Sequence, residues 1–290
     1  MQRRIFLQAA GIGAALTTQA GRLFAIDEAA SAAAQPSSRA VASGIAALDD
    51  LTGGFRPSEL TLIAGRPATG KTDLAQRIAQ LVAINGSRPV IYFSHELPRD
   101  ALLERMRASN ANVGLHRTGA DPLSVVERER LRSAGRQLAQ APLHIDDTAA
   151  LSPKEILERA RRFKTDKGDL GLVIVDYLQL MQSAVPVQYR ADALSAIAAD
   201  LKRLATELDA PMILLAMLHR DLLYRANKRP LLADLNRSGA IEPHADQVLL
   251  IDRDERYHPD PAQDPGVIEI QVAKNRRGPT GTVRLPVLRA

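Results

Sequence analysis

The chain has 290 residues, of which 46% are hydrophobic and 24% are charged, the composition of a water-soluble globular protein. It contains no cysteine, which excludes a disulfide framework and a thiolate metal site. The net charge of +5 fits a polyanionic partner or simply a basic proteome, and aromatic residues, at 3%, offer few surfaces for stacking on bases.

Residues 1–40 form an alanine-rich leader and linker that differs from the rest of the chain. Arg3 and Arg4 precede a short apolar run, Ala9 to Leu16, which is the outline of a twin-arginine export signal. The run is too short to span a membrane. The leader could instead be a helix that docks on a neighbouring subunit, or a tail of little consequence. On account of the motifs described next, we expect a cytoplasmic rather than an exported protein.

From residue 41 onward, apolar runs of strand length alternate with segments of helical periodicity. The pattern predicts helices at residues 71–86, 98–109, 121–140, 152–168 and 191–208. It predicts strands at residues 59–65, 89–94, 143–147, 170–180, 211–218, 247–251, 266–274 and within 276–288. Strands separated by helices indicate an α/β domain with a mainly parallel central sheet, and the consecutive strands at the end indicate an antiparallel C-terminal edge. We therefore expect one domain over residues 41–290.

The first predicted strand and the first predicted helix flank a sequence that is typical of a phosphate-binding loop. It fits the pattern G-x-x-x-x-G-K-S/T, in which the glycines allow backbone N–H groups to face the phosphates. Lys71 would lie against the β and γ phosphates of ATP, and the Thr72 hydroxyl would hold Mg²⁺. The predicted nucleotide-binding residues are Gly65, Arg66, Pro67, Ala68, Thr69, Gly70, Lys71 and Thr72.

Two acidic residues follow buried strands and should reach the same edge of the sheet as this loop. Asp176 comes after four apolar residues, where a charge is costly unless it binds something, so we predict that it helps to hold Mg²⁺. Glu96 follows the strand at 89–94 and could orient and deprotonate an attacking water. The alternative for Glu96 is a solvated residue at the end of a strand.

Three cations, Lys274, Arg276 and Arg277, lie where the strand predicted at 266–274 passes into a tight turn. They could be solvated side chains at a hairpin tip. The sharper hypothesis is an arginine finger that reaches the γ-phosphate of a neighbouring subunit, where positive charge stabilises the transferring phosphoryl group. A finger offered in this way requires an oligomer.

The order of these motifs resembles the C-terminal, RecA-like motor domain of the DnaB family of replicative DNA helicases, from about Ala42 to Leu288. The stretches that carry the resemblance are "SGIAALDDLTGGFRPSELTLIAGRPATGKT", "VIYFSHEL", "LHIDD", "LGLVIVDYLQLM", "RPLLADLNRSGAIEPHAD" and "QVAKNRRGPTGTVRLP". The resemblance implies a RecA-like P-loop NTPase fold, and a homo-oligomer, a six-membered ring, with ATP between subunits. It also implies translocation on single-stranded DNA.

The resemblance assigns roles to individual residues. It implies that Glu96 is the catalytic carboxylate and that Asp176 is the metal-linked acid. Lys274 and Arg276 match a Lys-x-Arg pair that acts on the neighbouring subunit, with Arg276 as the finger. The family pattern also places Arg237 and Gly239 in a loop that faces DNA in the central channel.

The chain departs from the family pattern in three places. Only about forty residues precede the motor, where full-length members carry a helical domain and a linker helix. Ala216 and Met217 stand where the family usually has Ser-Gln, and methionine cannot donate a hydrogen bond to a γ-phosphate. Asn236 and Arg237 stand where the family usually has Arg-Glu. Two hypotheses follow: a DNA helicase motor that works with replication proteins, or an ATP-binding assembly or regulatory protein that unwinds nothing.

Overall fold

The computed structural model of the chain describes residues 39–118, 123–183, 189–236, 240–253 and 266–286. Residues 1–38 of the predicted leader, and the predicted DNA contacts Arg237 and Gly239, lie outside the described residues. Over the described residues, we find no helix with both the length and the apolar character needed to cross a membrane.

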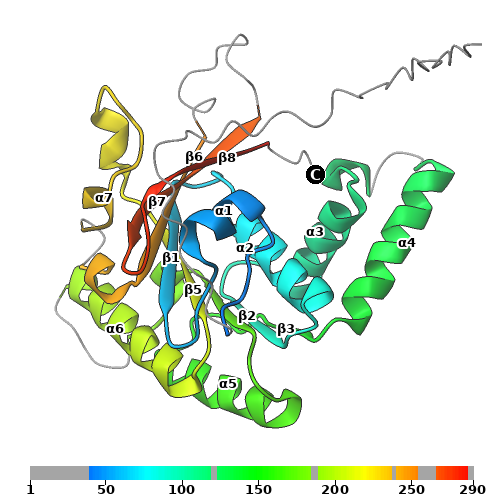
Figure 1. The fold of residues 1–290 in the computed structure, drawn as a ribbon, viewed down its shortest axis with the longest axis horizontal. Helices are drawn as coiled ribbons and strands as arrows, with labels where there is room; N and C mark the ends of the chain where they lie inside the picture. The colour runs from blue at the N-terminus through cyan, green and yellow to red at the C-terminus, as the bar shows by residue number, and fades with distance from the viewer. Residues whose placement is uncertain (1–38, 119–122, 184–188, 237–239, 254–265, 287–290) are drawn as a thin grey trace, which may run out of the picture. The chain divides into compact units, whose positions relative to one another are not determined.

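The described strands form an eight-stranded sheet in the order β3-β2-β4-β5-β1-β6-β7-β8 (Figure 1). Neighbouring strands from β3 to β6 pair in parallel, whereas β7 pairs with β6 and with β8 in antiparallel fashion. This confirms the predicted mainly parallel sheet with an antiparallel C-terminal edge. The strands are β1 (Leu60–Gly65), β2 (Val90–Ser94), β3 (Leu143–Asp146), β4 (Leu172–Asp176), β5 (Met212–Met217), β6 (Gln247–Asp252), β7 (Val267–Asn275) and β8 (Gly281–Pro286).

All five predicted helices are present. The one predicted at 71–86 is α-helical to Gln80 and continues as a π-helix, Leu81–Asn85, and the one predicted at 121–140 begins at Val125. The helix at 152–168 begins with the predicted capping box, since Ser152 Oγ accepts from the Glu155 N–H and the Glu155 carboxylate accepts from the Ser152 N–H. Two short helices, α1 and α7, were not predicted. The helices are α1 (Ala46–Thr52), α2 (Lys71–Gln80), α3 (Arg99–Ala111), α4 (Val125–Gln140), α5 (Pro153–Lys167), α6 (Arg190–Leu208) and α7 (Ala233–Asn236).

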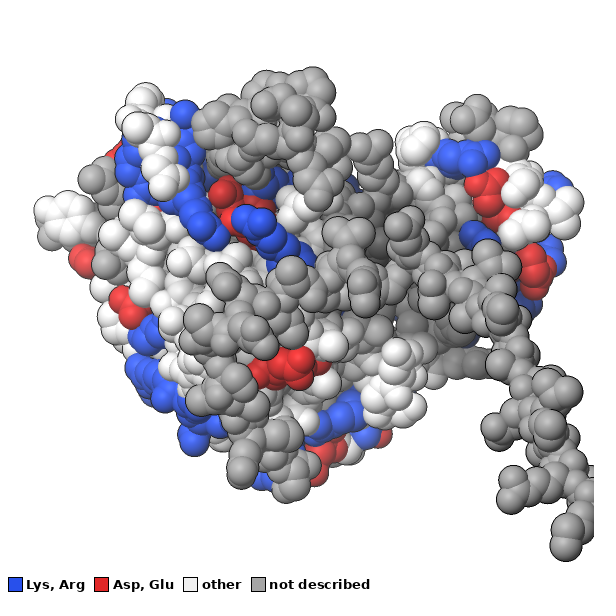
Figure 2. All heavy atoms as spheres, turned by 45° about the horizontal axis from the view of Figure 1, so that its top comes forward, with Lys and Arg blue, Asp and Glu red and all other residues white. Residues whose placement is uncertain are grey.

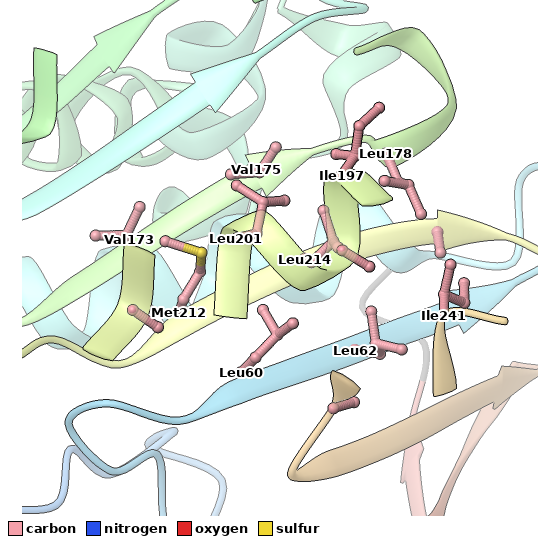
Figure 3. Packing of buried hydrophobic residues seen from close by; sticks show 14 of the residues in the cluster. Leu60, Leu62, Val173, Val175, Leu178, Ile197, Leu201, Met212, Leu214 and Ile241 are labelled. Atoms are coloured by element: carbon pink, nitrogen blue, oxygen red, sulfur yellow. The ribbon is translucent and has the colours of Figure 1, made fainter. Parts of the chain in front are cut away.

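The central strands are buried on both faces, which explains their continuous apolar runs. In β1, Leu60 and Leu62 pack on the side of α5 and α6, whereas Ile63 packs on the side of α2 and α3. Figure 3 shows the first of these layers, where strand residues face Ile197 and Leu201 of α6. Complete burial of each such side chain contributes roughly 1.5–3 kcal/mol, so the sheet is a rigid support for the loops at its edges.

The strand predicted at 170–180 is shorter than expected. It ends at Asp176, and the chain then forms a short 3-10 helix, Leu178–Leu180. The apolar run does not reveal this end, because Leu178 is buried even though it has left the sheet. Because β1, β2, β4 and β5 are parallel, their carboxyl ends lie at one edge of the sheet. The side chains and loops at this edge form the candidate site.

Candidate nucleotide-binding and active site

The predicted phosphate-binding loop connects the buried end of β1 to the start of α2 (Figure 1). Gly65 has no room for a side chain, since a Cβ there would meet Thr69 Oγ1 at 2.6 Å and the Ile251 carbonyl oxygen at 2.9 Å. Gly70 precedes the helix with a φ of +101°, a conformation that residues with a side chain rarely adopt. Both glycines are therefore required by the backbone path of the loop, and the positive end of α2 points toward it.

Polar groups within the loop hold its shape. The Arg66 carbonyl accepts hydrogen bonds from Lys71 Nζ and from Thr69 Oγ1, each 2.8 Å long. The Lys71 side chain is buried, with 7% of the residue exposed, and this burial lowers its pKa to about 8, against the opposing charges of Asp176 and Glu96. Lys71 is thus a cation at neutral pH with little solvent around it, which suits an anionic ligand.

Asp176 is buried at the end of β4, with 3% of the residue exposed. Its Oδ2 accepts a hydrogen bond of 2.7 Å from the Tyr92 hydroxyl, and its side chain is also hydrogen-bonded to Thr72. Burial raises the pKa of Asp176, and the hydrogen bonds from Tyr92 and Thr72 oppose that rise. The structure therefore brings the two predicted metal-binding residues into direct contact.

Glu96 is exposed and follows β2 by two residues. It lies close enough to the loop for its charge to raise the pKa of Lys71, where burial has the opposite and larger effect. It also adds to the rise in the pKa of Asp176, which burial dominates. The predicted catalytic carboxylate, the loop lysine and the predicted metal-linked acid thus share one electrostatic environment.

These side chains can hold an anion and a small hard cation together. Among the described residues, no group of three or more His, Asp or Glu side chains is arranged to bind a metal. Mg²⁺ usually takes only one or two protein ligands and completes its shell with water and phosphate oxygens. The contact between the Thr72 hydroxyl and the Asp176 carboxylate provides such a pair of oxygen ligands.

The predicted trans-acting cations lie at the opposite edge of the sheet. Lys274 Nζ forms an ion pair of 2.7 Å with Glu242 Oε1. Arg276 Nη1 lies 3.2 Å from Asp246 Oδ1, and its Nη2 donates to the Pro243 carbonyl at 2.8 Å. Arg277 pairs with Glu59, so all three cations have partners within the chain.

The path of β7 separates these cations from the phosphate-binding loop of the same chain. Ile268, near the start of β7, lies beside Gly70, where an added Cβ would meet its Cδ1 at 3.2 Å. From Ile268 to Arg276 the extended chain runs about 26 Å at ~3.3 Å per residue. Arg276 therefore cannot reach the phosphate-binding loop of its own chain.

Two residues of this region were missed by sequence reasoning. Tyr92 supports the Asp176 carboxylate, and Gln179 hydrogen-bonds the backbone of Met217 at the end of β5. A tyrosine in a strand that is buried on both faces was a usable signal, because its hydroxyl requires a partner. No signal in the sequence pointed to Gln179, since its contact joins two segments that are far apart in the chain.

The fold and this site define a P-loop nucleotide-binding domain of the RecA-like class. A family model described as "DnaB-like helicase C terminal domain" matches residues 40–289. The chain belongs to this family of DnaB-like helicase C-terminal domains. The predicted resemblance and the predicted RecA-like fold are both confirmed.

Individual relatives agree with this assignment. The replicative DNA helicase DnaB of Pasteurella multocida is 41% identical over 248 residues, which cover 84% of this chain and 53% of the relative. The replicative DNA helicase DnaB of Geobacillus stearothermophilus is 37% identical over 250 residues, or 86% of this chain and 55% of the relative. The chain thus spans about half the length of these curated relatives.

Solved structures show the same fold. A solved ATPase domain superposes with a TM-score of 0.82 at 31% identity, covering 88% of this chain and 90% of that domain. A DnaB-like replicative helicase, studied together with its interactions with primase, superposes with a TM-score of 0.81 at 31% identity. That match covers 85% of this chain and 61% of the helicase.

Proposed function

We propose that the chain is an ATP-hydrolysing DNA helicase motor of the replicative DnaB type, which assembles into a ring and moves along single-stranded DNA. The observation that carries this proposal is the meeting of the predicted nucleotide, metal and catalytic residues at one edge of the sheet, while the predicted finger lies at the other. An ATP-driven motor also favours a cytoplasmic place of action over export.

In this proposal the loop from Gly65 to Thr72 binds the phosphates of ATP through backbone N–H groups, the positive end of α2 and the Lys71 ammonium. Thr72 and Asp176 hold Mg²⁺, which supplies positive charge to the β and γ phosphates when it is bound. The buried Asp176 carboxylate is costly when charged and unpaired, so a cation beside it offsets that cost.

Glu96 accepts a proton from the attacking water and orients that water toward the γ-phosphorus. Its exposed position after β2 supports this role, because water can reach the carboxylate while the charge still acts on the loop. Lys71 neutralises charge on the transferred group from the same chain. Arg276 and Lys274 do so from the neighbouring chain, since they cannot reach their own loop.

If the neighbouring chain supplies the arginine finger, a complete active site contains residues of two subunits and forms only in the oligomer. Head-to-tail contacts of this kind close into a ring when the rotation between subunits allows it. We propose a homo-oligomer, and a hexamer in particular, by analogy with the family. Replication proteins are proposed partners, because one solved relative was studied with primase.

Single-stranded DNA is the proposed track, with Arg237 and Gly239 as its contacts in the channel. Figure 2 shows one face, on which lysine and arginine side chains alternate with acidic ones over the described residues. The described part of that face thus carries both signs of charge, and in this proposal Arg237 supplies positive charge for phosphate contact.

The alternative is an ATP-binding assembly or regulatory protein of the same fold that does not unwind DNA. Met217 favours it, because a methionine side chain cannot donate a hydrogen bond to the γ-phosphate. A strand-displacement assay with a tailed duplex separates the two hypotheses. We expect ATP, but not a non-hydrolysable analogue, to support strand release by the full-length chain. Nucleotide binding without strand release would favour the alternative.

The affinity for ATP should fall as the pH rises through about 8. The buried Lys71 amine has a pKa lowered to about 8, so above this pH the free chain must take up a proton before the cation can face the phosphates. The loss approaches about tenfold for each pH unit above the pKa. Calorimetric titration of ATP between pH 7 and pH 9.5 measures it.

Lys71→Arg is the matched control for this titration, because its guanidinium stays charged throughout the range. The variant should bind ATP with an affinity that changes little with pH. An identical pH dependence in the variant and in the natural chain would mean that another group is responsible.

A further inference from the structure

The end of β5 is hydrogen-bonded from both sides. On the β1 side, the Leu218 N–H donates to the Gly65 carbonyl at 3.2 Å, and Arg66 Nη1 donates to the Leu218 carbonyl at 2.9 Å. On the β4 side, the Met217 N–H donates to Gln179 Oε1 at 3.0 Å, and Gln179 Nε2 donates to the Met217 carbonyl at 3.0 Å. Successive residues of a parallel strand direct their backbone groups to opposite neighbours, as observed here.

Gln179 takes the place of a strand residue at this point. The pairing of β4 with β5 stops at Val175 and Leu214, because β4 ends and the chain turns away after Asp176. Without Gln179, both backbone groups of Met217 would lose the partners they have on that side. The Gln179 side-chain amide presents a donor and an acceptor in the arrangement of a peptide group, so it extends the ladder beyond the end of β4.

The contacts at the end of β5 connect the segment after Asp176, the start of α6 and the phosphate-binding loop. Gln179 lies three residues after the metal-linked acid, and its backbone carbonyl is fixed by Arg190 at the start of α6. Arg66 belongs to the phosphate-binding loop. A displacement of either segment therefore acts directly on residues 217 and 218.

The side chain of Met217 cannot donate a hydrogen bond to the γ-phosphate, since it has no hydrogen-bond donor. The backbone N–H and C=O of residue 217 can still respond to nucleotide, and Gln179 is hydrogen-bonded to both. We propose that Gln179 is the positioning residue that couples the nucleotide-binding edge to the end of β5, in place of a polar side chain at position 217. This inference rests on the proposed binding of ATP and Mg²⁺.

Hydrogen–deuterium exchange of the full-length chain tests this coupling without any need for DNA. Exchange is measured with Mg²⁺, with and without a non-hydrolysable ATP analogue, in peptides covering residues 63–75 and 213–225. In the natural chain the analogue should slow exchange in both peptides. In Gln179→Met, which keeps the size of the side chain but loses both hydrogen bonds, slowing at 63–75 should persist. Slowing at 213–225 should fall about fivefold.

A second variant and a control make the test specific. Gln179→Glu keeps an acceptor for the Met217 N–H but places a carboxylate against the Met217 carbonyl, so it should give a loss at least as large as Gln179→Met. Gln182→Met replaces an exposed glutamine of the same segment and should behave as the natural chain. Unchanged exchange of β1 in the absence of nucleotide shows that each variant is folded.

The outcomes separate the inference from the proposed function. If the analogue slows exchange at 63–75 but not at 213–225 in the natural chain, or if Gln179→Met and the natural chain respond alike, the inference is overturned while nucleotide binding stands. If the analogue slows exchange in neither peptide of the natural chain, the proposed function fails, and the inference fails with it.

Discussion

Glu96→Gln should reduce steady-state ATP hydrolysis by about 10²- to 10⁴-fold while leaving nucleotide binding nearly unchanged. The amide cannot accept a proton from water, but it occupies the same volume and remains exposed after β2. Removing the negative charge also removes one influence that keeps Lys71 protonated, so a small change in ATP affinity is expected. Phosphate release and ATP affinity are measured with the full-length chain.

The control is Glu158→Gln, which removes the same carboxylate from an exposed position on α5. It should hydrolyse ATP at the natural rate. A Glu96→Gln variant that retains most of its turnover would show that another group activates the water. In that case the exposed position of Glu96 would mark it as a solvated residue at the end of a strand.

Most of the fold could be predicted because its signals are local. Continuous apolar runs identified the buried strands, and the capping box of Ser152 and Glu155 marked the start of α5. α1 was missed for a physical reason: it has only seven residues and no side-chain cap, so its stability comes from packing against β7 and β8. The periodicity of apolar residues within a segment does not reveal packing against strands that lie far along the chain.

The candidate site could be predicted in part. A buried strand that ends in an acid indicated Asp176, because an unpaired buried charge is costly. The sequence did not show that Tyr92 would support this carboxylate or that Arg66 would turn to the Leu218 carbonyl. Both contacts depend on which strands are neighbours in the sheet, and strand order is a property of the whole chain.

The buried charges of the site lower the stability of the free chain and favour the binding of a charged ligand. Lys71 and Asp176 are both buried, and burial shifts the pKa of each toward its neutral form. Each charge is therefore held at a cost to the free chain, which phosphate and Mg²⁺ would offset on binding. Active sites commonly sacrifice some stability in this way to be ready for a ligand.

Arg276→Ala should lower ATP hydrolysis by about 10³-fold or more, and the loss should be rescued by a second inactive variant. The reason is geometric, since Arg276 lies at the edge of the sheet opposite the phosphate-binding loop of its own chain. In a mixture with Glu96→Gln, some interfaces combine the intact Glu96 of one chain with the intact Arg276 of its neighbour. Such interfaces should hydrolyse ATP although neither variant does so alone.

The rescue is measured by titrating one variant into the other at constant total protein. Activity should pass through a maximum near equal amounts, at no more than about a quarter of the natural rate, because random assembly makes about a quarter of the interfaces complete. Mixing Arg276→Ala with Lys71→Ala should give the same rescue, whereas an Arg276→Ala/Glu96→Gln double variant mixed with either single variant should give none. An absence of rescue in assemblies that are shown to exchange subunits would mean that Arg276 does not act on the neighbouring chain. Its ion pair with Asp246 would then account for its place in the turn between β7 and β8.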